Sequence, residues 1–211
     1  MAERTVEHCR PIEPDPDNAG GGNNVKPQRT SSDTKILVEI TVFSALSAAL
    51  YVVRPFTLPF GGSITLGSMV PVMWLSLRRG VQVGIITGMI FGLLALFEDL
   101  VLVGAANIIA TPLQAVLEYP VAFGVIGLTG LFRNKSALVA VAGAGASVFV
   151  RFLIHYFVGV FVWANVYSFP PEWGLWLWPA VYNGSFLTVD FIICAILLYA
   201  LMKEGTLRYR L

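Results

Sequence analysis

Apolar stretches separated by short polar connections fill the chain from residue 35 onward. A helix needs about 20 predominantly apolar residues to cross the hydrocarbon core of a bilayer. Stretches of this kind fall at 35–54, 66–77 with its flanks, 81–97, 106–132, 137–163 and 179–202. The pattern therefore predicts an all-α membrane protein with six transmembrane helices. The second helix is expected to start irregularly or as a re-entrant segment, because Pro71 lies inside it and Gly61 and Gly62 precede it.

The first 34 residues differ in composition from the rest of the chain. They hold 10 of the 27 acidic and basic residues, four prolines and a run of three glycines. Such a segment cannot bury enough apolar surface to offset the entropy lost on ordering. We therefore expect a disordered polar tail at 1–34, a transmembrane substrate-binding domain at 35–203 and a short basic tail at 204–211.

Overall composition narrows the class of protein. The chain is 56% hydrophobic and 13% charged, whereas soluble domains have about 45–50% apolar and about 25% charged residues. This composition argues against an ordinary water-soluble enzyme, and a formal net charge of +1 argues against a nucleic-acid partner. The two cysteines, Cys9 and Cys194, lie far apart, so we expect neither a disulfide framework nor a metal site.

Charges between the apolar stretches predict the orientation in the membrane. With a cytoplasmic N-terminus, the inner side receives eight basic residues, namely Lys35, Arg78, Arg79, Arg133, Lys135, Lys203, Arg208 and Arg210. The outer loops receive one base, Arg54, together with Glu98, Asp99 and Glu172. This asymmetry follows the positive-inside rule. We therefore expect a multi-pass protein of the cell membrane with both termini cytoplasmic, and an outer segment at 163–178 that acts as an aromatic belt or a lid.

Three ionisable residues fall deep within predicted helices: Glu118, Arg151 and Asp190. At a rise of about 1.5 Å per residue, all three lie in one layer near the middle of the bilayer. Two carboxylates and one guanidinium leave a formal charge of −1, which a monocationic ligand would neutralise. The alternative is a structural pair of Arg151 with Asp190, with Glu118 in its neutral form.

Four residues of the fifth predicted helix recur every four positions and so share one face: Arg151, His155, Gly159 and Trp163. A flat heteroaromatic ligand could stack on the two rings and approach the backbone at the glycine. By helical spacing, Asn183 faces the same way as Asp190, and Gln114 the same way as Glu118. The pattern indicates a cavity in the outer half of the bundle. Taken singly, His155 could instead hydrogen-bond between helices and Trp163 could belong to an aromatic belt.

Small residues line the first predicted helix. Thr41, Ala45 and Ala49 are spaced by four, and Ser44 and Ala48 form a parallel row. This spacing allows close approach of another helix, either of a partner protein or within the bundle. The chain has no phosphate-binding G-x-x-x-x-G-K-[ST] motif. We therefore expect a capture subunit, and ATP hydrolysis only in partner subunits.

Several segments, in this order and spacing, resemble the thiamine-specific S components of energy-coupling factor (ECF) transporters. The resemblance covers nearly all of residues 35–202. It rests on GGSITL at 61–66 followed by LSLRRG at 75–80, QAVLEY at 114–119, GLTGLF at 127–132, His155 through Gly159 to Trp163, and YNGS at 182–185.

This resemblance implies the S-component fold and thiamine capture from the outer face, with no catalytic activity and no cofactor. It also implies a membrane-embedded coupling subunit and two ATPase subunits as partners, with the small-residue face of the first helix as the contact. Glu118 matches the family carboxylate that faces the vitamin, and Tyr119 follows it at the polar end. His155 and Trp163 match an aromatic pair, and Asn183 a polar contact.

Two departures from the family pattern concern the site. Trp178 stands where family members often carry a tyrosine, which keeps a stacking surface but removes a hydroxyl. Gly61 and Gly62 stand where an aromatic residue is expected, and Phe56 or Phe60 could substitute. Alternatives are an S component for another vitamin or precursor such as hydroxymethylpyrimidine, and a small membrane-embedded enzyme.

Overall fold

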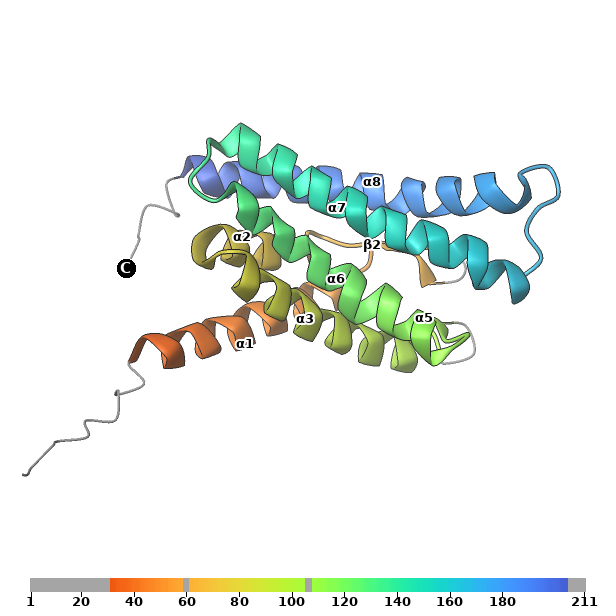
Figure 1. Ribbon diagram of the computed structural model, residues 1–211, viewed down its shortest axis with the longest axis horizontal. Helices are drawn as coiled ribbons and strands as arrows, with labels where there is room; N and C mark the ends of the chain where they lie inside the picture. The colour runs from red at the N-terminus through yellow and green to blue at the C-terminus, as the bar shows by residue number, and fades with distance from the viewer. Residues whose placement is uncertain (1–30, 59–60, 105–107, 205–211) are drawn as a thin grey trace, which may run out of the picture.

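The computed structural model describes residues 31–58, 61–104 and 108–204, which fold mainly into helices. Figure 1 shows their arrangement. The helical runs are α1 (Ser31–Val52), α2 (Val70–Arg79), α3 (Val81–Leu102), a composite fourth run at Pro112–Phe132, α7 (Ala137–Phe161) and α8 (Gly174–Lys203). The predicted six helices are thus confirmed. Of the expected tails, residues 1–30 and 205–211 lie outside the described residues, and α1 already begins at Ser31.

Five of the six helical runs are long and apolar enough to cross a membrane, and α2, with 10 residues, is the short one. The chain approaches α2 through a small hairpin of β1 (Phe56–Thr57) and β2 (Ser63–Ile64), paired antiparallel. Pro71 stands in the first turn of α2, where its missing N–H costs no helical hydrogen bond. The irregular start expected for this helix is therefore present.

The fourth run packs closely against α3 through glycines. A Cβ atom at Gly92 would lie 2.8 Å from the carbonyl carbon of Tyr119, and one at Gly88 would lie 3.0 Å from Cα of Gly124. Small residues let two helix backbones approach in this way. The contact fixes the backbone around residue 119 against a second helix, and residue 119 borders the site described below.

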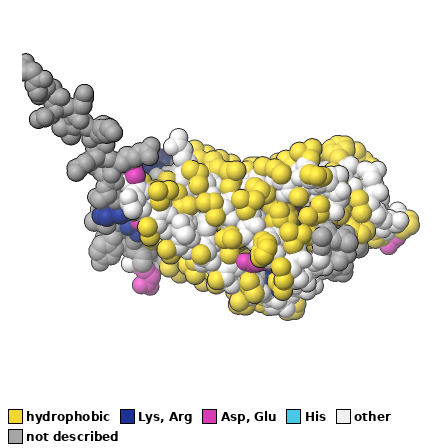
Figure 2. All heavy atoms as spheres, turned by 90° about the horizontal axis from the view of Figure 1, so that it is seen from below, with side chains coloured by type: hydrophobic (Ala, Val, Ile, Leu, Met, Phe, Trp, Pro, Cys, Tyr) yellow, Lys and Arg dark blue, Asp and Glu magenta, His cyan; other side chains and the backbone are white. Residues whose placement is uncertain are grey.

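Exposed apolar side chains cover the middle of the molecule, as Figure 2 shows for one face, while the basic side chains gather mainly at one end. Val101 and Phe97, for example, remain largely exposed on α3. The start of α1 and the end of α8 lie at the same end of the bundle in Figure 1. At the α1–α2 contact, Glu39 accepts two hydrogen bonds of 2.6 Å from Arg79.

The sequence placed Glu98 and Asp99 in an outer loop after the third helix, and this prediction is wrong. Glu98 and Asp99 belong to the last turns of α3, and only 2% of Asp99 is exposed. Arg54 follows α1, but its side chain is also buried, and its Nη1 donates to Asp99 Oδ1 at 2.5 Å. The two charges offset each other, so the apolar stretch can extend through Leu102 and carry a carboxylate inside the protein.

Candidate binding site

Glu118 lies on a local irregularity of the fourth run. This run consists of α5 (Pro112–Val116), the π-helical turn η3 (Leu117–Val121), α6 (Ala122–Gly124) and the 3-10 helix η4 (Val125–Phe132). Pro120 lies inside η3 and cannot donate the backbone hydrogen bond that an α-helix requires there. Such π-helical turns occur frequently at functional sites, because they redirect side chains within a helix.

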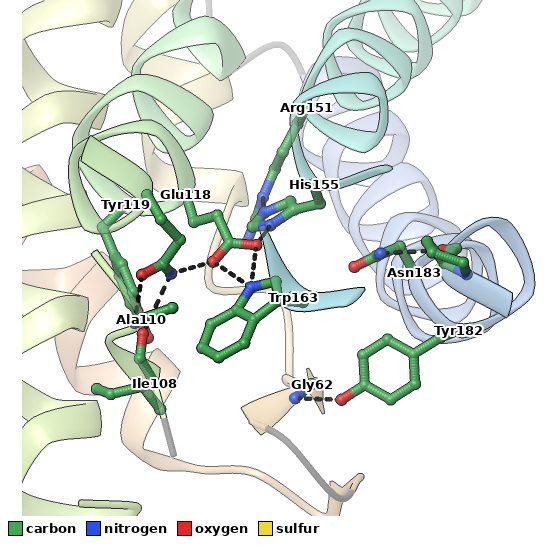
Figure 3. Close-up of polar contacts among 12 residues, drawn as sticks. Gly62, Ile108, Ala110, Glu118, Tyr119, Arg151, His155, Trp163, Tyr182 and Asn183 are labelled. Atoms are coloured by element: carbon green, nitrogen blue, oxygen red, sulfur yellow. Dashed lines mark hydrogen bonds and ion pairs between the residues drawn. The ribbon is translucent and has the colours of Figure 1, made fainter. Parts of the chain in front are cut away.

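The Glu118 carboxylate meets two residues of the chain's second half (Figure 3). Trp163 Nε1 donates to both oxygens, at 3.2 and 3.0 Å, and His155 Nδ1 lies 3.4 Å from Oε1. α7 ends at Phe161, and Trp163 belongs to the short η5 turn (Trp163–Asn165). The indole thus reaches Glu118 from beyond the helix on which its spacing placed it.

Gln114 holds Glu118 from its own helix. Its amide Nε2 donates to Glu118 and, at 3.1 Å, to the carbonyl of Ile108, while its Oε1 accepts from the N–H of Ala110 at 3.1 Å. Gln114 is 1% exposed, and Thr111 caps the helix by accepting from its N–H. Gln114 and Glu118 therefore share one face, as their spacing predicted, and a direct hydrogen bond between them orients the carboxylate.

Arg151 and Asp190 line the same cavity as Glu118 but are held by different neighbours. Asp190 Oδ1 accepts from the N–H of Thr65 at 3.0 Å and from its hydroxyl at 2.7 Å. The Arg151 guanidinium lies 3.9 Å from the ring centre of Phe123, and its Nη1 is 3.1 Å from Sδ of Met69. Among the described residues, no ion pair joins Arg151 to Asp190.

Two cavities meet at Glu118, Trp163 and Asn183, which border both. The inner cavity has a volume of about 80 Å³ and polar walls that include Tyr51, Asp99, Tyr119, Arg151 and Asp190. The outer cavity has about 290 Å³ and mainly aromatic walls that include Tyr167, Trp178 and Tyr182. A ligand with one polar end and aromatic rings matches this division.

The outer cavity contains both the tryptophan that departs from the family pattern and a tyrosine that sequence reasoning missed. Trp178 lies inside α8, with its ring 6.1 Å from that of Tyr182. The Tyr182 hydroxyl accepts from the N–H of Gly62 at 3.0 Å (Figure 3). A hydroxyl is therefore present near Trp178. The sequence could have indicated Tyr182 as a site residue, because it lies directly before Asn183.

Gly159 and Gly62 serve close packing. A Cβ atom at Gly159 would lie 2.8 Å from Cβ of Pro179, so this position lets α7 approach α8 at the border of the outer cavity. A Cβ atom at Gly62 would lie 2.7 Å from the Tyr182 hydroxyl. Phe56, one of the two suggested aromatic substitutes, is exposed, and Phe60 lies outside the described residues.

The two rows of small residues on α1 have different environments. Ser44 and Ala48 are buried, and the Ser44 hydroxyl donates to the carbonyl of Thr87 at 3.1 Å. Thr41, Ala45 and Ala49 are exposed. One row therefore packs within the bundle, and the other remains available. Within the described part of the chain, no group of three His, Cys, Asp or Glu side chains could hold a metal ion.

Comparison with known proteins identifies relatives along most of the chain. The family model described as "Thiamine transporter protein (Thia_YuaJ)" matches residues 37–208. The thiamine transporter ThiT of Bacillus subtilis (strain 168) is 32% identical over 182 residues, covering 80% of this chain and 91% of that protein. ThiT of Lacticaseibacillus paracasei is 28% identical over 163 residues, covering 71% and 78%.

Solved structures show the same fold. The structure of ThiT from Listeria monocytogenes superposes with a TM-score of 0.66 at 27% identity, covering 83% of this chain and 98% of that one. The S component of a bacterial ECF transporter superposes with a TM-score of 0.55 at 18% identity, covering 82% and 96%, which is a likeness of fold alone.

Proposed function

The chain belongs to the thiamine transporter family, and from this premise we propose that it captures thiamine from the outer face of the membrane at the two joined cavities. The family consists of transporters and not of enzymes, and the chain is a multi-pass membrane protein. The observation that supports the site best is the contact of Glu118 with Trp163 and His155 where the two cavities meet.

The charge balance of the inner cavity suits a monocation. Glu118 and Asp190 carry two negative charges against the single positive charge of Arg151, while Asp99 is matched by Arg54. The balance remains −1 when this additional pair is included. The thiazolium ring of thiamine carries one positive charge, so its binding beside Glu118 would neutralise the site.

The size and lining of the cavities suggest how the ligand lies. An inner volume of about 80 Å³ is about half of the ~150 Å³ that holds a benzene ring. It therefore suits the hydroxyethyl tail of thiamine better than either of its rings. The outer cavity of about 290 Å³ offers Trp163, Tyr167 and Trp178 for stacking on flat rings, and a cation over such a ring gains about 0.5–2 kcal/mol. The thiazolium would then lie at the junction, next to Glu118.

We assign transport to an assembly of this chain with partner subunits. The chain carries no ATP-binding motif, and the S-component fold supports delivery of thiamine inward by a membrane coupling subunit with two ATPase subunits. The basic residues at the α2–α3 turn and beyond η4 support cytoplasmic termini by the positive-inside rule. The exposed row of Thr41, Ala45 and Ala49 on α1 is the proposed contact with the coupling subunit.

The test is a titration of the detergent-purified chain with thiamine, followed by tryptophan fluorescence. We expect saturable quenching at sub-micromolar thiamine, lost in Trp163→Ala. Glu118→Gln should weaken binding about 100-fold, because removing a buried charge partner costs about 3 kcal/mol. Glu172→Gln, which changes an exposed carboxylate, is the matched control. Saturation by hydroxymethylpyrimidine without a response to thiamine would overturn the choice of ligand and leave the fold in place.

A further inference from the structure

Asp99 is a buried carboxylate that joins three side chains around the inner cavity. Its Oδ2 accepts from the hydroxyls of Tyr119 at 2.7 Å and of Tyr51 at 3.1 Å, and its Oδ1 accepts from Arg54 Nη1. Asp99, Tyr119 and Tyr51 all line the inner cavity, and the two tyrosines are 8% and 7% exposed. The contacts connect α1, α3 and the π-helical turn that carries Glu118.

The chemistry of these contacts fixes where the hydroxyl protons point. An ionised carboxylate only accepts hydrogen bonds, whereas a phenol has one proton to donate and lone pairs that accept. Arg54 supplies the positive charge that keeps an ionised carboxylate stable in a buried place. Each tyrosine that donates its proton to Asp99 therefore presents only an acceptor oxygen to the cavity.

We propose that Asp99 is a positioning residue that selects a hydrogen-bond donor at the inner end of the binding site, by holding the Tyr119 hydroxyl as an acceptor. This inference rests on the proposed function. The thiamine hydroxyethyl group carries an O–H that can donate to the Tyr119 oxygen. When the tail oxygen is methylated, it can only accept a hydrogen bond. The ether oxygen then faces the Tyr119 oxygen, which is also an acceptor, and the Tyr119 oxygen stays without a donor from the ligand. Asp99 thus contributes to specificity through the Tyr119 hydroxyl.

A comparison of thiamine with its O-methyl ether tests the proposal. The measured quantity is the ratio of the two dissociation constants, ether over thiamine, obtained by titration calorimetry on the purified chain. We expect a ratio of about five or more for the natural chain, because an unpaired buried acceptor costs about 1–3 kcal/mol. In Asp99→Asn the side-chain amide can donate to the Tyr119 oxygen and free its proton for the cavity. The ratio should then fall severalfold, with the ether binding more tightly than to the natural chain.

Two further variants keep the result interpretable. Tyr119→Phe removes the acceptor and should also lower the ratio. Tyr199→Phe removes the hydroxyl of an exposed tyrosine that lines neither cavity, so it should leave the ratio unchanged. The methyl group adds the same bulk in every variant, so a change of ratio reports the hydrogen bond. A purely structural role of Asp99 would weaken both ligands equally.

Several outcomes would overturn the inference. They are a natural chain with a ratio near one, an Asp99→Asn variant that keeps the natural ratio, and, if Asp99→Asn does not fold, a Tyr119→Phe variant that keeps it. Each of these can occur while thiamine still binds. If the natural chain does not bind thiamine at all, the proposed function itself fails, so the two failures are distinguishable.

Discussion

The indole N–H of Trp163 donates to both carboxylate oxygens of Glu118, at 3.2 and 3.0 Å, across 45 positions of sequence. The carboxylate proposed to lie beside the cationic ring of the ligand therefore already accepts a hydrogen bond from the protein. A cationic ring that comes to lie beside Glu118 has to compete with this hydrogen bond. The contact joins the wall of the inner cavity to the segment at 163–173 that borders the outer one.

Trp163→Phe keeps an aromatic ring and removes the N–H. We expect thiamine to associate about fivefold faster, because one hydrogen bond of about 1 kcal/mol no longer has to be broken. Stopped-flow measurement of the remaining tryptophan fluorescence gives the rate. Trp176→Phe, on the exposed face of α8, is the control. An unchanged association rate in Trp163→Phe would show that the hydrogen bond does not limit access.

Gln114→Ala removes the amide that orients Glu118. The carbonyl of Ile108 and the N–H of Ala110 lose their partner, so we expect a loss of about 2 kcal/mol in stability together with weaker thiamine binding. Thermal unfolding in detergent and the fluorescence titration measure the two effects. Gln82→Ala changes an exposed glutamine of α3 and should alter neither. Natural affinity in Gln114→Ala would contradict an orienting role.

Gly92→Ala tests the close packing behind the site. The added Cβ would lie 2.8 Å from the carbonyl carbon of Tyr119, and overpacking of this kind costs about 1–3 kcal/mol. We expect a lower unfolding temperature and weaker thiamine binding. At Gly184 a Cβ atom would meet only an ordinary contact, 3.7 Å from Phe152, so Gly184→Ala should be neutral or slightly stabilising. Equal effects of the two substitutions would refute the packing argument.

Ala45→Leu places a large side chain on the exposed row of α1. A contact with the coupling subunit at this row would be overpacked by about 1–3 kcal/mol, which is about a five- to 150-fold loss of affinity. Co-purification with the coupling and ATPase subunits measures assembly, and thiamine titration should remain unchanged. Ala142→Leu makes the same change at an exposed position of α7. Full assembly of Ala45→Leu would place the contact elsewhere.

Much of the fold followed from local sequence patterns. Hydropathy over about 20 residues predicted six helices, because crossing a bilayer requires this length of apolar chain. The small residues of α1 also indicated helix contact. Burial then separated the row at Ser44 and Ala48, which packs inside, from the row at Thr41, Ala45 and Ala49, which is exposed. Spacing by four describes both rows equally, so only the packing of neighbouring helices could distinguish them.

The candidate site was predictable in its members and less so in its contacts. Spacing placed Glu118, Arg151, His155 and Asp190 in one region, and the structure brings all four to the inner cavity. Spacing also suggested a gap for a ligand at Gly159, and in the structure this residue both borders the outer cavity and packs against Pro179. Glu98 and Asp99 read as loop residues, because two adjacent carboxylates at the end of an apolar stretch normally mark its end.

By itself, the sequence determined the number of helices, the membrane class and the candidate residues of a site for a flat cation. Each of these depends on composition or on spacing within one helix. Tertiary structure alone decided three sets of hydrogen bonds. Trp163 donates to Glu118, the Tyr182 hydroxyl accepts from the N–H of Gly62, and Asp99 accepts from the hydroxyls of Tyr51 and Tyr119. These pairs lie 20 to 120 positions apart, and their geometry depends on how helices turn and pack against one another, which no local periodicity encodes.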